Sequence, residues 1–188
     1  VLSARHLPPP VELLERNRHF VAGLPAGLKP QERAVRNVFH SCRPDVVPLI
    51  EQEGLKPPAC PYCLHQEVWI DHDEGWFGDH SKGVYVSKHA DYTFLYPSLR
   101  KPEPGSEGVV VMLELVTGRV RRFDKPDAGV QPSPGHDCHE SPNHLEFYVW
   151  DEASCAAPPA GCCRAVPRWE VRWRAVANAR TGISEDGK

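Results

Sequence analysis

The pattern of apolar and polar positions predicts a chain made mostly of short strands. Runs of apolar residues at Val35–Cys42, Gly83–Ser87, Gly108–Leu115 and Leu145–Trp150 have the length and the β-branched or aromatic content of strands. Pro167–Val176 alternates apolar with charged residues, which indicates a strand buried on one face. In this strand we expect the core to receive Trp169, Val171 and Trp173, and solvent to receive Glu170, Arg172 and Arg174.

Two further local signals add a hairpin and a few short helices. Gly118 predicts a turn that folds Arg119–Phe123 back onto Gly108–Leu115, and Pro126–Pro142 is expected to be a loop. Helical spacing and helix-ending residues predict helices from Val11 onward with Pro10 near the start, at Gln31–Arg36, at Pro44–Gln52 before Gly54, and at Lys88–Tyr96 before Pro97.

Composition agrees with short elements and long connections. The chain has 188 residues with 20 Pro and 14 Gly, which favours one domain of strands joined by loops over a helical bundle. It contains neither a G-x-G-x-x-G nor a G-x-x-x-x-G-K-[ST] motif, so a Rossmann or P-loop protein is not expected. The predicted class is α+β with antiparallel strands.

The net charge and the cysteine content limit which partners and which cellular compartment we expect for the protein. A formal net charge of −3 gives no electrostatic reason to expect nucleic-acid binding. The longest apolar stretch, Gly108–Leu113, is too short to cross a bilayer. Seven unevenly spaced cysteines favour a reduced, intracellular protein of the cytoplasm or nucleus. Because residue 1 is Val, we expect the chain to be a domain of a larger protein.

Three separated motifs carry the candidate chemistry. They are centred on His40 in Phe39-His-Ser-Cys42, on Tyr85 in Gly83-Val-Tyr-Val-Ser87, and on Glu146 in Leu145-Glu-Phe-Tyr-Val-Trp-Asp151. Each motif alone is weak, because a lone His or Tyr near a strand is most often a packing residue. In this order they resemble the His-Tyr-Glu signature of the diphtheria-toxin-type ADP-ribosyltransferases, the class that includes the catalytic domain of poly(ADP-ribose) polymerases (PARPs).

The resemblance implies a fold and an activity. The fold is an antiparallel split β-sheet with a few short helices over residues 35–177, after a helical lead-in at 1–34 and before a flexible tail at 178–188. The activity is NAD-dependent mono-ADP-ribosylation of a protein or nucleic-acid acceptor, with release of nicotinamide. NAD is then the substrate, and the protein acceptor or partner is left open.

The resemblance also implies a role for each matching position. Tyr85 and Tyr96, eleven positions apart, would hold the nicotinamide ring between them. The backbone of Ser41 and the hydroxyl of Thr93 would recognise its carboxamide. His40 would bind the adenosine ribose. Glu146 would accept a hydrogen bond from the nicotinamide ribose and stabilise the cation that forms as nicotinamide leaves.

A second resemblance keeps an alternative open. Ser41 stands where the family usually has Gly, and Leu145 precedes Glu146 where it usually has Asn. The segments Gly83–Asp91, Val109–Leu115 and Pro132–His139 resemble the catalytically inactive pseudo-PARP domain of the TASOR family. The alternative function is therefore an inactive domain that serves as a protein-interaction module.

A metal site is the remaining hypothesis. The spacing Cys60-x-x-Cys63 suits a structural zinc ion, which needs two more ligands. The candidates are His65, His72 and His80 nearby, or His136, Cys138 and His139 farther along, and the predicted set is Cys60, Cys63, His72 and Cys138. The alternative is two ordinary cysteines beside a turn at Pro61. A nucleophilic Cys42 is not expected, because nothing near it resembles a protease signature.

Overall fold

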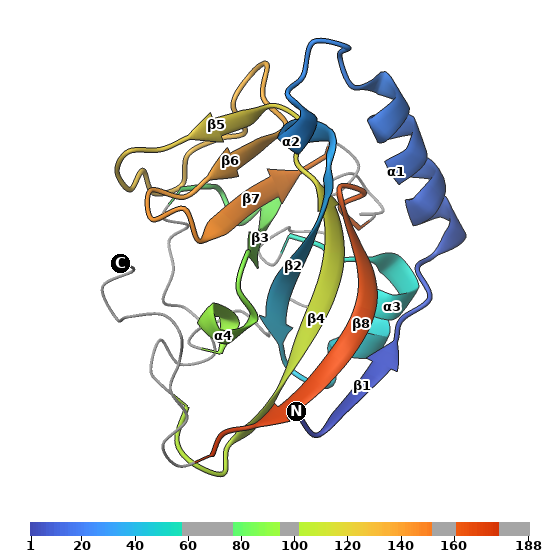
Figure 1. Cartoon of the computed structure of the whole chain (residues 1–188), viewed down its shortest axis with the longest axis vertical. Coiled ribbons are helices and arrows are strands. Elements are labelled where there is room, and N and C mark those ends of the chain that lie inside the picture. The colour runs from blue at the N-terminus through green and yellow to red at the C-terminus, as the bar shows by residue number, and fades with distance from the viewer. Residues whose placement is uncertain (58–76, 95–101, 152–160, 177–188) are drawn as a thin grey trace.

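The computed structural model describes residues 1–57, 77–94, 102–151 and 161–176. These residues form a sheet of eight strands in the order β1-β8-β4-β2-β3-β7-β6-β5, with four helices around it (Figure 1). The strands are β1 (Ser3–His6), β2 (Val35–Cys42), β3 (Gly83–Ser87), β4 (Glu107–Val116), β5 (Val120–Arg122), β6 (Cys138–Glu140), β7 (Glu146–Trp150) and β8 (Ala165–Arg174). The helices are α1 (Val11–Gly23), α2 (Pro30–Arg33), α3 (Val47–Glu53) and α4 (Ala90–Thr93).

The sheet is antiparallel and split. Among the described strands, every pair is antiparallel except β5 with β6. Strands β2 and β3 are joined at a single register pair, Phe39 with Ser87, and then diverge (Figure 1). The split separates β1-β8-β4-β2 from β3-β7-β6-β5. The predicted α+β class with a split antiparallel sheet and a few short helices is therefore confirmed.

Strand alternation divides the buried side chains of β3 and β7 between two clusters. Val84 and Val149 join the main aliphatic core, whereas Tyr85 and Tyr148, each one position along its strand, join an aromatic cluster. Neighbouring residues of a strand point to opposite faces, which explains the division. The aromatic cluster consists of Phe77, Tyr85, Phe123, Tyr148 and Trp150.

Most predicted elements are confirmed with close boundaries. β2 and β3 occupy the predicted residues Val35–Cys42 and Gly83–Ser87. Helix α1 begins directly after Pro10, and α3 ends at Gly54, whose φ of 80° suits a residue without a side chain. Of the helix predicted at Lys88–Tyr96, only Ala90–Thr93 is helical among the described residues, and residues from 95 onward lie outside the described ranges.

The hairpin predicted at Gly118 is wrong. The chain does turn there, at a φ of 62°, but β5 pairs in parallel with β6 rather than with β4. The reason is Asp137, which accepts hydrogen bonds from the backbone N–H of Arg119 at 2.8 Å and from its Nε at 2.9 Å. These bonds draw the start of β5 to the segment before β6. β6 itself lies in the stretch Pro126–Pro142 that the sequence predicts to be a loop.

The burial predicted for β8 is partly wrong. Trp173 is buried and Arg172 and Arg174 are exposed, as predicted, but Trp169 is 41% exposed and Glu170 only 3%. Glu170 is held by Arg5 of β1, whose Nε donates to it at 2.9 Å. The predicted alternation assumed one buried face along the whole strand. Near Glu170 the opposite face of β8 is covered instead, because Arg5 lies over it and bonds to both Glu170 and Glu51 of α3.

Residues 3–6 also differ from their prediction. The sequence predicts a helical lead-in there, yet these residues form β1, which pairs with β8 from Ser3 to His6. The later part of that segment is helical in α1 and α2, but the helix predicted at Gln31–Arg36 ends at Arg33, because β2 begins at Val35. The proposed division of the chain at residues 34 and 177 stays a prediction.

Candidate functional site

The His-Tyr-Glu residues lie on adjacent strands where the sheet splits. His40 is on β2, Tyr85 on β3, and Glu146 is the first residue of β7, opposite Ser87. His40 is linked to Tyr85 directly, because its Nδ1 lies 2.9 Å from the Tyr85 carbonyl oxygen. Since a carbonyl oxygen can only accept, Nδ1 carries the hydrogen. The fold therefore brings together three residues that are far apart in the sequence.

The His40 side chain is partly exposed, and its surroundings favour the uncharged form of the imidazole. Burial of the ring lowers its pKa, and the hydrogen bond to the Tyr85 carbonyl opposes this change without reversing it. The bond also takes the place of a ladder bond at the point where β2 and β3 separate. His40 thus links β2 to β3 at the point where the two strands separate.

The ring of Tyr85 is enclosed by other aromatic side chains. Its centroid lies 4.8 Å from those of Phe77 and His80 and 5.3 Å from that of Tyr148. Its hydroxyl donates to the Gly78 carbonyl oxygen at 3.0 Å, and the side chain as a whole is buried. Gly78 has no room for a side chain, since a Cβ there would meet the Tyr148 ring at 2.4 Å. The segment before β3 therefore packs tightly onto Tyr85.

Glu146 is completely buried. Its exposed fraction is 0%, and the hydroxyl of Tyr92 donates to its Oε2 at 3.3 Å. Its backbone is fixed by Ser141, whose Oγ accepts from the Glu146 N–H at 3.0 Å. A ribose hydroxyl can reach this carboxylate only if surrounding side chains, Tyr92 among them, move away. Tyr92 was not predicted to belong to the site, and only its position seven residues after Tyr85 could have drawn attention to it.

The two residues expected to recognise a carboxamide are also engaged within the protein. The Thr93 hydroxyl is buried and donates to the Ala90 carbonyl oxygen at 2.6 Å, inside α4. The Ser41 hydroxyl donates to the Val109 carbonyl oxygen at 3.4 Å, across to β4. Tyr96, the second predicted aromatic residue, lies outside the described residues. As folded, the Thr93 hydroxyl is therefore used within α4, and the roles expected of the Ser41 backbone and of Tyr96 stay predictions.

A buried polar network anchors the segment that covers Tyr85. His139 of β6 is 0% exposed, and its Nδ1 lies 2.9 Å from the Phe77 carbonyl oxygen. Its Nε2 accepts from the Ser133 hydroxyl at 2.8 Å, and Arg121 donates to the same hydroxyl at 2.6 Å. Burial lowers the pKa of His139 to about 4, so the ring is neutral near pH 7. The sequence singled out His139 only as a zinc candidate.

The predicted zinc site falls mostly outside the described residues. Cys60, Cys63 and His72 are not described. Cys138 is, and its side chain is fully buried in the aliphatic core, where burial raises the pKa of the thiol. Within the described ranges, no three His, Cys, Asp or Glu side chains gather closely enough to hold a metal ion. The zinc site stays a prediction.

The fold has a relative among solved structures. A crystal structure of the TASOR pseudo-PARP domain superposes on the chain with a TM-score of 0.68, covering 93% of this chain and 82% of that one at 17% sequence identity. The chain has a PARP-like fold. At 17% identity the similarity concerns the fold alone. No family model and no curated protein sequence matches the chain. Among the helices described in this PARP-like fold, none is long and apolar enough to cross a membrane.

Proposed function

We propose that this chain is a catalytically inactive, pseudo-PARP type domain that serves as a protein-interaction module. The observation that carries the proposal is the complete burial of Glu146 beneath the Tyr92 hydroxyl. An ADP-ribosyltransferase stabilises the departing sugar cation with a carboxylate, which must therefore touch the substrate. In this chain the carboxylate is occupied within the protein.

The enclosure of Tyr85 supports the same proposal. A ring that is to stack on nicotinamide needs a free face, whereas His80, Phe77 and Tyr148 surround the ring of Tyr85. Opening the site would expose aromatic surface and break the bond from the Tyr85 hydroxyl to Gly78. Binding energy spent on such rearrangement is lost to catalysis.

A second candidate function is NAD-dependent mono-ADP-ribosyl transfer. It is supported by the presence of Glu146 and by the bond that fixes His40 against Tyr85. NAD would supply the ADP-ribosyl group and a nicotinamide leaving group. His40 would hold a ribose hydroxyl, and Glu146 would stabilise the sugar cation once Tyr92 had moved aside.

Two measurements separate the candidates. Titration calorimetry with NAD is expected to show no micromolar binding, and incubation with labelled NAD is expected to leave the protein and added acceptor proteins unlabelled. Micromolar binding together with labelling that is lost in Glu146→Gln would overturn the proposal in favour of the transferase. Thermal unfolding of Glu146→Gln controls for misfolding of the variant.

A reduced compartment is part of the proposal. The four cysteines that the structure describes, Cys42, Cys138, Cys162 and Cys163, are free thiols. This supports the expected cytoplasmic or nuclear location, where thiols stay reduced.

A further inference from the structure

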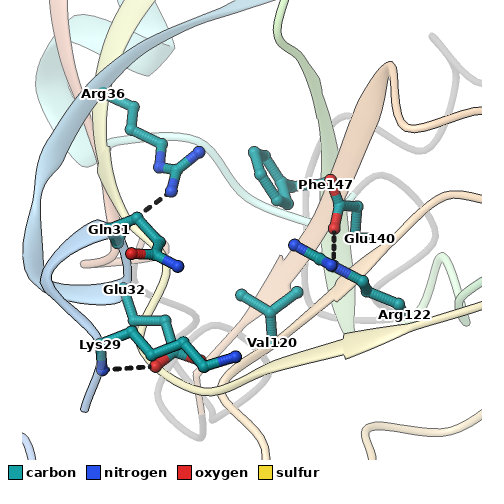
Figure 2. Close-up of a pocket in the computed structure, with 8 residues that line it drawn as sticks. All are labelled: Lys29, Gln31, Glu32, Arg36, Val120, Arg122, Glu140 and Phe147. Carbon is teal, nitrogen blue, oxygen red and sulfur yellow. Dashed lines mark hydrogen bonds and ion pairs between the residues drawn. The ribbon is translucent and has the colours of Figure 1, made fainter.

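A cationic pocket lies between the two halves of the split sheet. It has a volume of about 160 Å³, with Lys29 and Arg36 on one side and Val120, Arg122 and Glu140 on the other (Figure 2). Its aromatic wall is Phe147, which follows Glu146 on β7. Adjacent strand residues point to opposite faces, so Phe147 points away from Glu146, and His40, Tyr85 and Glu146 do not line the pocket.

The one acidic group deep in the pocket is already neutralised. Glu140 is 6% exposed and forms ion pairs with Lys88 and with Arg122, whose Nε lies 2.7 Å from its Oε2. Despite burial, these partners hold the pKa of Glu140 below its ordinary value. The ammonium of Lys88 also lies 4.6 Å from the centre of the Phe147 ring. One carboxylate here faces two cations, which leaves an excess of positive charge.

Arg36 adds a cation without an acidic partner. One terminal nitrogen, Nη2, donates to the Gln31 carbonyl oxygen at 2.7 Å, and the guanidinium lies 5.8 Å from the centre of the Phe147 ring. Within the described part of the chain, no carboxylate pairs with Arg36, and its Nε is buried without an acceptor. Figure 2 shows the guanidinium pointing across the pocket toward Phe147. A buried N–H without an acceptor is costly, and an anion that accepts from Arg36 in the pocket would offset that cost.

Lys29 completes the cationic side of the pocket. The carboxylate of Glu32 next to it accepts from the backbone N–H of Lys29 at 2.8 Å. The lining contains three basic and two acidic residues, and Lys88, which pairs with Glu140, adds a fourth basic residue. The excess of two positive charges favours an anionic ligand.

We propose that this pocket binds the carboxylate of an acidic side chain presented by a partner protein. The inference rests on the proposed function, since it names the chemistry of the partner that such an interaction module takes. A planar, singly charged carboxylate suits a guanidinium, and its methylene stem would lie against Phe147 and Val120. A phosphate dianion is disfavoured, because Glu32 and Glu140 line the same space.

The test is an NMR titration of the whole chain that follows the arginine side-chain Nε–H signals. The probe is a capped tetraglutamate peptide, with tetraglutamine as the neutral comparison. We expect tetraglutamate alone to shift the Arg36 signal, and Arg36→Gln to weaken binding about tenfold, the loss typical of one charge-assisted hydrogen bond. Arg43→Gln is the matched control, because Arg43 is an exposed arginine just beyond the other end of β2 and pairs with Asp45. It is expected to leave binding unchanged.

Several outcomes would overturn the inference. Equal weakening by Arg43→Gln would mean attraction to net charge rather than binding in the pocket. Tighter competition by inorganic phosphate than by acetate would contradict the carboxylate assignment. If Arg36→Gln unfolds, Val120→Phe fills the pocket while keeping Arg36, and unchanged binding by that variant would also count against the site. NAD turnover tests the proposed function separately, because Arg36 lies outside the His-Tyr-Glu site.

Discussion

Among individual residues, His139 is the one through which the stability of the fold should depend most on pH. It is buried, neutral and bonded on both ring nitrogens, to the Phe77 carbonyl oxygen and to Ser133. A protonated ring would lose the hydrogen bond that Nε2 accepts from the Ser133 hydroxyl. Through Phe77 the ring also supports the segment that packs on Tyr85.

We predict that acid destabilises the protein through His139. The folded pKa is about 4, below the ordinary value of 6.5, so the unfolded chain binds the proton first. The contribution is fully present above pH 6.5 and is lost as the pH falls toward 4, by roughly 2 kcal/mol at pH 5. His40, whose pKa is also lowered, acts in the same direction. Urea unfolding at pH 7 and pH 5 measures the loss.

The control for this prediction is His139→Gln, which cannot titrate. Its unfolding free energy is expected to change less between pH 7 and pH 5 than that of the parent. Asp137 and Glu140 have lowered pKa values, so their contributions are lost only at lower pH. An equal fall in parent and variant would refute the assignment to His139.

Among the elements, β5 depends on a single acidic residue for its place. Asp137 is 6% exposed and holds Arg119, while Arg164 forms a second ion pair with it at 3.6 Å. Gly118 permits this approach, because a Cβ there would meet Asp137 at 2.7 Å. The turn direction at Gly118 is therefore set by a residue nineteen positions away.

We predict that Asp137→Ala destabilises the protein by about 2–4 kcal/mol, because it leaves Arg119 and the half-buried Arg164 without their partner. Amide hydrogen exchange in β5 is expected to accelerate more than in β4. Asp124→Ala, at an exposed position, is the control and is expected to change stability by less than about 0.5 kcal/mol. Unchanged exchange in β5 would contradict this account of the turn.

For the whole molecule, β1 closes one edge of the sheet. It covers β8 from Ser3 to His6, and Arg5 joins Glu170 of β8 to Glu51 of α3. Without β1, the backbone of β8 would present an open edge, which promotes association between chains. The fold of residues 35–176 thus draws on the first six residues of the chain.

We predict that deletion of residues 1–6 lowers the unfolding free energy by roughly 2 kcal/mol or more and increases light scattering at high concentration. The deletion stops before Leu7, which is fully buried. Removal of Val1 alone, which is 89% exposed, is the control and should leave both measurements unchanged. A stable, monomeric deletion variant would show that β1 is dispensable.

The candidate site could be predicted only in part. Motif order identified His40, Tyr85 and Glu146, because their residue types and strand positions are visible locally. Their surroundings were not visible: Tyr92 covers Glu146, and His80 packs on Tyr85 at 4.8 Å. Whether a catalytic residue type is open or covered depends on contacts that no local pattern records.

The sequence by itself determined which segments form strands or helices and where most of them begin and end. The spacing of apolar residues and the positions of Gly and Pro influence the backbone only within a few residues, so they can be read locally. Strands β2 and β3 follow from that local information. Only the tertiary structure decided which strands pair and which side chains are buried. The parallel pairing of β5, the burial of Glu170 by Arg5 and the burial of Glu146 all depend on residues distant in the chain. Ion pairs and packing formed on folding select among arrangements that local propensity leaves equal.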